Sequence, residues 1–73
     1  MTDISHLIPE LRSTAAGKRR SAAILLGKSG NLTAIDPLVE ALSDPHPGVR
    51  GDIVQALRMY LAILGGRPRI SVI

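Results

Sequence analysis

The sequence predicts an all-α protein in which two similar helical hairpins, four helices in all, stack in the manner of an α-solenoid. Three observations support this prediction. The composition lacks Phe, Trp and Cys, and Leu, Ala, Ile and Val make up most of the apolar residues. Apolar residues recur at the i, i+3, i+4, i+7 spacing that lines one face of a helix. The chain also matches itself when it is shifted by 31 residues.

The length and composition limit the size of the core and the class of protein. The 73 residues suffice for one domain, 1–73, which buries only about 60% of the surface that its unfolded chain exposes. No cysteine is present, so neither a disulfide nor a thiolate metal site supports the fold. The net charge of +3 is of a size that serves solubility. A cytoplasmic protein without a membrane span is expected, because the apolar runs are too short to cross a bilayer.

The self-match divides the chain into two repeats. Repeat 1 is expected at about residues 3–30, repeat 2 at about 33–65, and a C-terminal tail at 66–73. The segment "LIPEL" falls on "LVEAL", and the match keeps Gly-x-Arg in step with the apolar residues on both sides. The aligned pairs include Leu7 with Leu38, Leu11 with Leu42, Gly17 with Gly48, Arg19 with Arg50, and Leu26 with Leu57.

Repeat 1 is predicted to hold two helices. Ile4, Leu7, Ile8 and Leu11 line one face of the first helix. Pro9 falls in the first turns of this helix, where its missing N–H costs least. The second helix is expected over about 17–28, with an apolar side and a basic start.

Repeat 2 follows the same plan. Thr33 and Asp36 are spaced as a capping box at the start of the third helix. Asp44, Pro45, Pro47 and Arg50 are predicted to form the tight structural turn between the third and fourth helices. Pro47 suits the first position of a helix, because it has no N–H to lose. The fourth helix is expected to run to Leu64 and to end at the following glycines.

The segment "AIDPLVEALSDPHPGVRGDIVQAL", residues 34–57, carries a family resemblance. It resembles the HEAT-repeat family, in the short form that is also found in phycobilisome lyase proteins. The resemblance covers about residues 4–65 and implies an α-solenoid whose Asp44 and Arg50 tie the turn to the helix by hydrogen bonds. The chain departs from the family pattern at three places: His46 replaces a capping Asp, Asn or Ser, Gly51 and Asp52 stand where Ala or a charged helix former is common, and "RM" at 58–59 replaces a Leu-Gly ending. The matching residues are Leu7, Leu11, Arg19, Ala22, Ala23, Leu26 and Gly27, and then Pro37, Leu38, Val39, Leu42, Asp44, Pro45, Val49, Arg50, Ala56 and Leu57.

The last helix carries more apolar surface than two repeats can cover. Its apolar arc is wider than the ~100° stripe of a one-sided surface helix, and helical repeats usually need about three units for stability. The sequence therefore predicts a protein–protein interaction module that associates with itself, as a homodimer, through the last helix. The predicted interface residues are Ile53, Leu57, Met59, Tyr60, Leu61, Ile63 and Leu64.

The sequence leaves two alternative functions open. The basic cluster Lys18, Arg19 and Arg20 suggests contacts to the phosphate backbone of a nucleic acid as an alternative function. The family resemblance suggests a second alternative, an accessory protein of a phycobilin lyase. No catalytic arrangement, metal-ligand spacing or cofactor motif is present in the sequence, so a protein that is not an enzyme and carries no cofactor is expected.

Overall fold

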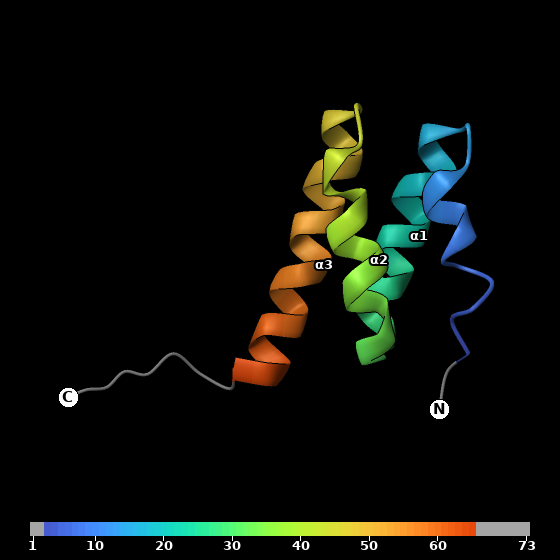
Figure 1. Ribbon diagram of the computed structural model, residues 1–73. Coiled ribbons are helices and arrows are strands. Elements are labelled where there is room, and N and C mark those ends of the chain that lie inside the picture. The colour runs from blue at the N-terminus through green and yellow to red at the C-terminus, as the bar shows by residue number, and fades with distance from the viewer. Residues whose placement is uncertain (1–2, 66–73) are drawn as a thin grey trace.

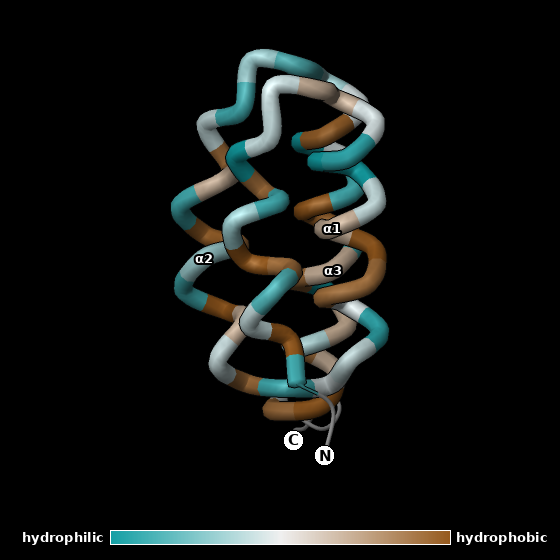
Figure 2. The backbone as a smooth tube through the Cα atoms, turned by 90° about the vertical axis from the view of Figure 1, so that its right-hand side faces the viewer, coloured by the Kyte–Doolittle hydropathy of each residue, from teal (hydrophilic) through white to brown (hydrophobic). Residues whose placement is uncertain are grey.

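The computed structural model describes residues 3–65, and the helices account for most of them. The three α-helices are α1 (Ala16–Ser29), α2 (Ile35–Glu40) and α3 (Pro47–Gly65). Three short 3₁₀ helices complete the order: η1 (Pro9–Arg12), η2 (Leu32–Ala34) and η3 (Ala41–Ser43). The helices α1 and α3 pack side by side in one layer, and α2 and the N-terminal segment form the other (Figures 1 and 2). The all-α prediction is thus confirmed for the part of the chain that the structure describes.

The prediction of four α-helices is wrong, because the first apolar segment forms turns and η1 instead. Its backbone hydrogen bonds join residues three apart: the amide of Leu7 donates to Ile4 O at 2.9 Å, and that of Leu11 donates to Ile8 O at 3.1 Å. Pro9 is the physical reason, because it has no N–H to donate and its ring crowds the carbonyl four residues earlier. The segment still fills its place in the stack, since both Ile4 and Leu11 are buried.

The predicted capping box at Thr33 and Asp36 is also wrong. Asn31 takes the capping role instead: its Oδ1 accepts hydrogen bonds from the Thr33 amide at 3.1 Å and from Thr33 Oγ1 at 2.7 Å. Asn readily forms such local turns with the backbone two residues on. The Thr33 hydroxyl is engaged as a donor in this turn, and the N-terminal boundary of α2 has no side-chain cap.

The predicted start of the fourth helix is confirmed, because Pro47 is the first residue of α3. The helix was expected to reach Leu64, and it extends to Gly65, the last described residue. The predicted second helix, 17–28, corresponds to α1, which ends with Gly30 in the left-handed region at φ 69°.

The core lies between the two layers and consists of aliphatic residues and one tyrosine. At its centre α1 and α3 come very close, because a Cβ added to Gly27 would stand 2.8 Å from Ala56 Cβ. Only glycine at position 27 therefore permits this approach of the two helices. The buried apolar residues are Ile4, Leu11, Ala22, Ala23, Leu26, Ala34, Leu38, Val49, Ile53, Ala56 and Tyr60.

Three further expectations concern the chain as a whole. The predicted tail, 66–73, lies outside the described residues, and the repeat boundaries stay predictions. Within 3–65, none of the helices has the length and hydropathy that crossing a membrane requires.

Candidate functional site

Two arginines occupy equivalent positions in the two repeats and bind the backbone in the same way. Arg19 Nη1 donates to the carbonyls of Ser13 at 2.8 Å and Thr14 at 3.3 Å. Arg50 Nη1 donates to the carbonyls of Asp44 at 2.8 Å and Pro45 at 3.1 Å. Each arginine thus ties its helix to the turn five and six residues earlier.

The other nitrogens of Arg19 join the two repeats. Its Nε lies 2.7 Å from Asp44 Oδ2 and its Nη2 lies 3.3 Å from Asp44 Oδ1. The side chains of this pair are only 14% and 6% exposed. A two-point guanidinium–carboxylate contact of this kind is strong and directional. Arg19 and Asp44 therefore set how repeat 2 sits on repeat 1.

Asp44 is held by its own turn as well as by Arg19. The His46 amide donates to Asp44 Oδ1 at 2.9 Å. Burial alone would raise the pKa of the Asp44 carboxyl, but the His46 amide and the Arg19 guanidinium outweigh burial and hold this pKa below its ordinary value. The predicted turn residues thus act together, although Arg50 contacts the backbone of Asp44 rather than its carboxylate.

His46 is a better cap than the sequence suggested. Its Nδ1 accepts a hydrogen bond of 3.0 Å from the amide of Gly48, the second residue of α3. The imidazole nitrogen therefore caps the N-terminus of α3, a role that an Asp, Asn or Ser oxygen often has.

Three buried residues of repeat 1 have counterparts in repeat 2 that are more exposed, whereas Ala22 and its counterpart Ile53 are both buried. Leu11, Ala23 and Leu26 are 6%, 0% and 0% exposed and belong to the core cluster that both repeats build. Their partners in the 31-residue alignment are Leu42 at 37%, Val54 at 46% and Leu57, which is half-buried. The packing surface of repeat 1 is thus present a second time on repeat 2, but it is open to solvent.

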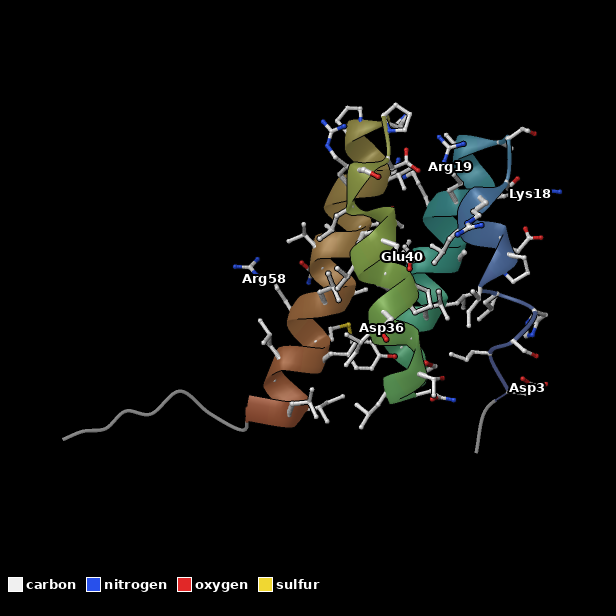
Figure 3. All side chains as sticks on the ribbon, viewed as in Figure 1. Asp3, Lys18, Arg19, Asp36, Glu40 and Arg58 are labelled. Carbon is white, nitrogen blue, oxygen red and sulfur yellow. The ribbon has the colours of Figure 1, made fainter. Side chains whose placement is uncertain are left out.

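This surface, here called the outer face, runs along one side of α3. Arg50, Val54, Leu57 and Leu61 follow the i, i+4, i+7, i+11 spacing of a single helix side. Leu61 is 69% exposed, and Arg58, beside it, points away from the other helices (Figure 3). The outer face comprises Leu42, Arg50, Val54, Leu57, Arg58 and Leu61.

The predicted interface residues separate into two groups. Ile53 and Tyr60 belong to the core, with exposures of 0% and 1%, so they do not line a surface. The other members are exposed or half-buried: Leu57, Met59, Leu61, Ile63 and Leu64. Leu42 is exposed but was not among the predicted interface residues. Its alignment with the buried Leu11 at the 31-residue shift is the sequence signal that could have identified it.

The basic cluster is largely engaged within the chain. Arg19 binds Asp44, and Arg20 Nε lies 2.8 Å from Asp52 Oδ2, which raises the pKa of the Arg20 guanidinium. Lys18 is exposed and has no carboxylate partner within residues 3–65. The predicted contacts of these three residues with phosphate stay predictions.

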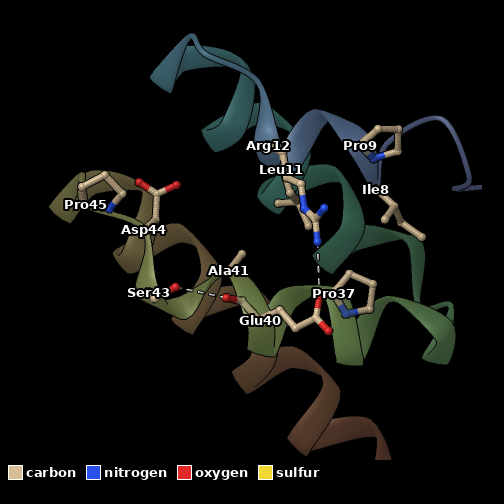
Figure 4. A pocket seen from close by; sticks show the side chains of 10 residues that line it. All are labelled: Ile8, Pro9, Leu11, Arg12, Pro37, Glu40, Ala41, Ser43, Asp44 and Pro45. Carbon is tan, nitrogen blue, oxygen red and sulfur yellow. Dashed lines mark hydrogen bonds and ion pairs between the residues drawn. The ribbon is translucent and has the colours of Figure 1, made fainter.

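A shallow groove of about 660 Å³ lies between the N-terminal segment and α2 (Figure 4). Across this groove, Arg12 Nη2 lies 3.8 Å from Glu40 Oε1, and the two side chains are 85% and 72% exposed. An ion pair this exposed contributes little to stability. No group of three or more metal-ligating side chains occurs in the described part of the chain.

Comparisons with known proteins bear on the family and on the reaction class. The family model for HEAT repeats matches residues 4–69. The chain is also 48% identical over 52 residues to the phycocyanobilin lyase subunit alpha of Picosynechococcus sp.. That stretch covers 71% of this chain and 18% of the relative. No solved structure matches.

The relative corrects one expectation from the sequence. The chain was predicted not to be an enzyme, because its residues form no catalytic motif. A similar protein is named as a subunit of a lyase, and this finding overturns that prediction. The family match covers nearly the whole described chain. The chain therefore belongs to the HEAT-repeat family.

Proposed function

We propose that this chain is a protein-binding module whose outer face holds a helical partner. The observation that supports the proposal is the difference in burial between Leu11, Ala23 and Leu26 and their counterparts on repeat 2. Burying one large aliphatic side chain contributes about 1.5–3 kcal/mol. A partner that covers Leu42, Val54 and Leu61 therefore gains free energy of this order for each of these side chains that it buries.

The name of the relative supports an assembly of more than one chain. The Picosynechococcus protein is called a subunit, and a subunit works together with other chains. The present chain corresponds to 18% of that protein. We place the module in an assembly of this kind, with the outer face as its contact surface.

In one form of this proposal the partner is a second copy of the chain, and the protein self-associates. The charge of the outer face argues for a different partner. Both Arg50 and Arg58 are exposed there, and a chain that carries acidic groups complements them better than a copy with the same charges.

Light scattering on the natively produced chain tests the proposal. After size-exclusion chromatography, a species well above the 7.7 kDa of a single chain is expected. The Leu61→Asp variant should elute alone, while Ser21→Asp, on the exposed side of α1 beside the N-terminal segment, should keep the complex. The proposal fails when the native chain elutes alone at every concentration.

The 48% identity to the lyase subunit favours a second candidate function. In this function the chain takes part in a lyase reaction on phycocyanobilin. Phycocyanobilin is coloured, so its visible absorbance reports binding or conversion. A saturable change is expected when the chain, together with any co-eluting protein, is added, and an unchanged spectrum would exclude this function.

A further inference from the structure

The end of α3 carries the most exposed large apolar side chains in residues 3–65. Leu61, Ile63 and Leu64 lie in the last turns of this helix and are 69%, 57% and 59% exposed. Leu32 begins η2, which lies at the same end of the molecule (Figure 1), and it is half exposed. These four residues are here called the apolar end. Exposed apolar clusters of this kind mark surfaces that contact a protein or a membrane.

The net charge of the chain is concentrated beside the apolar end. Residues 1–57 hold six of the nine basic side chains and all six acidic ones, so their charges cancel. Residues 58–73 hold the other three basic side chains, Arg58, Arg67 and Arg69, and no acidic one, which accounts for the whole net charge of +3. A segment that is both apolar and basic is complementary to the surface of a membrane that contains anionic lipids.

The directions of the apolar side chains distinguish a lipid surface from a partner helix. Leu61 and Ile63 are two residues apart, so their side chains point about 200° apart around α3. Leu61 belongs to the outer face, whereas Ile63 lies on the side of Ala56, which faces Gly27 of α1. One helix docked on the outer face covers Leu61 and leaves Ile63 in water. Fluid lipid, in contrast, surrounds a helix end on all sides.

From these observations we propose that the apolar end inserts into the surface of a membrane that contains anionic lipids, and that Arg58, Arg67 and Arg69 bind the lipid phosphates. The inference goes beyond the proposed function and does not rest on it. The apolar end shares only Leu61 with the outer face, so variants at its other positions test the two surfaces separately.

The length of the apolar end and the charges around it fit such a contact. The residues from Leu61 to Leu64 rise about 6 Å along the helix, and helices at a membrane surface bury their apolar side chains about 5–10 Å deep. Asp3 and Asp36 lie on the N-terminal segment and on α2 rather than on the last turns of α3 (Figure 3). An anionic surface therefore favours the orientation in which α3 is nearest to the lipid.

The test measures co-sedimentation of the full chain with two kinds of vesicle, phosphatidylcholine alone and phosphatidylcholine mixed with the anionic lipid phosphatidylglycerol. We expect the chain to bind the anionic vesicles on the order of a hundredfold more tightly, because each basic side chain near such a surface strengthens binding roughly fivefold. Arg67→Gln with Arg69→Gln should weaken binding roughly twentyfold. The control is Lys18→Gln, at the start of α1, which should change binding less than about twofold, because salt screens a charge far from the surface.

The apolar contribution is tested with a second pair of variants. Ile63→Ser with Leu64→Ser removes two exposed side chains of the apolar end and should weaken binding at least about tenfold. Val39→Ser with Val54→Ser removes two exposed aliphatic side chains elsewhere and should leave vesicle binding unchanged. Circular dichroism shows that the variants are folded, which is expected because all four positions are exposed.

Three results would overturn the inference. A chain that stays in the supernatant with both kinds of vesicle does not bind lipid, and its apolar end is then left to a protein partner. Equal binding to neutral and anionic vesicles would reject the role of the arginines. Serine variants at 63 and 64 that bind as well as the Val39 and Val54 control would show that the apolar end is not the contact. None of these results affects the proposed function, which light scattering judges separately.

Discussion

The hydroxyl of Tyr60 on α3 donates a hydrogen bond of 2.6 Å to the carbonyl of Leu26, in the last turn of α1. The same oxygen lies 2.9 Å from the carbonyl of Asn31. Carbonyls in the last turn of a helix have no partner within the helix. The single aromatic residue of the chain thus fills the core with its ring and caps a neighbouring helix with its hydroxyl.

Removal of this hydroxyl should destabilise the fold. Tyr60→Phe keeps the ring and loses the donor to Leu26, so we expect the free energy of unfolding to fall by about 1 kcal/mol. Ser29 Oγ also donates to Leu26 O, at 2.8 Å, and the double variant with Ser29→Ala should lose more than Tyr60→Phe alone. Urea unfolding followed by circular dichroism measures both. Equal stability of Tyr60→Phe and the parent would show that the hydrogen bond has no net effect.

The close approach of α1 and α3 predicts opposite effects of alanine at two glycines. Gly27→Ala places a Cβ 2.8 Å from Ala56 Cβ and should cost about 1–3 kcal/mol. Gly51→Ala meets nothing within 4 Å and should stabilise α3 by up to about 1 kcal/mol, because alanine favours the helix. Thermal unfolding compares the two. The same Cβ would stand 3.0 Å from Ala56 Cα, so Ala56→Gly relieves only part of the clash. A Gly27→Ala variant as stable as the parent would contradict the close approach of the two helices.

The pair of Arg19 and Asp44 predicts loss of stability in acid. The pKa of Asp44 is lower in the folded protein than in the unfolded chain, so this carboxylate stabilises the fold above its unfolded pKa of about 3.9. That contribution is lost as the pH falls below about 4 and passes through the folded pKa.

The pH dependence of unfolding in Asp44→Asn measures this contribution. The variant should be less stable than the parent at neutral pH, and the gap should close in acid. Asp3 also has a lowered pKa, because the amide and hydroxyl of Ser5 donate to it. The pH dependence of Asp3→Asn therefore serves as the comparison for a carboxylate that is held by its own turn alone. A gap of constant size from pH 7 to pH 2 would rule out the charge of Asp44 as its cause.

The imidazole cap of α3 predicts a ranking of substitutions at position 46. His46→Ala removes the acceptor for the Gly48 amide and should cost about 1 kcal/mol. His46→Asn offers an oxygen to the same amide and should be as stable as the parent or more so. Chemical unfolding of the three proteins decides this, and an alanine variant as stable as the asparagine variant would be inconsistent with capping by His46.

The sequence predicted the parts of the fold that depend on periodicity and on helix boundaries. The apolar spacing located α1 and α3, and Pro47 marked the start of α3, because proline fits the first helical position. The first helix was wrongly predicted, because the apolar spacing of Ile4, Leu7 and Leu11 indicates which side chains face the core and not which backbone hydrogen bonds form. There the effect of Pro9 on hydrogen bonding outweighs the pattern.

The outer face was only partly predictable. A helical wheel treats each helix alone, so it grouped the buried Ile53 and Tyr60 with the exposed Leu61. Which side of α3 faces repeat 1 depends on the contact between Gly27 and Ala56, and helix spacing does not encode that contact. The contact between Arg19 and Asp44 was likewise not predictable from helix spacing, because the two residues are 25 positions apart.

Cross-linking at Leu61 tests the central claim most directly, namely that a partner protein covers the outer face. A photoreactive amino acid replaces Leu61 in one variant and Ser21 in another, and the covalent adducts formed in the native cells are weighed by mass spectrometry. We predict one discrete adduct from position 61 and none of that mass from position 21. Equal labelling at both positions, or no adduct at position 61, would contradict the claim.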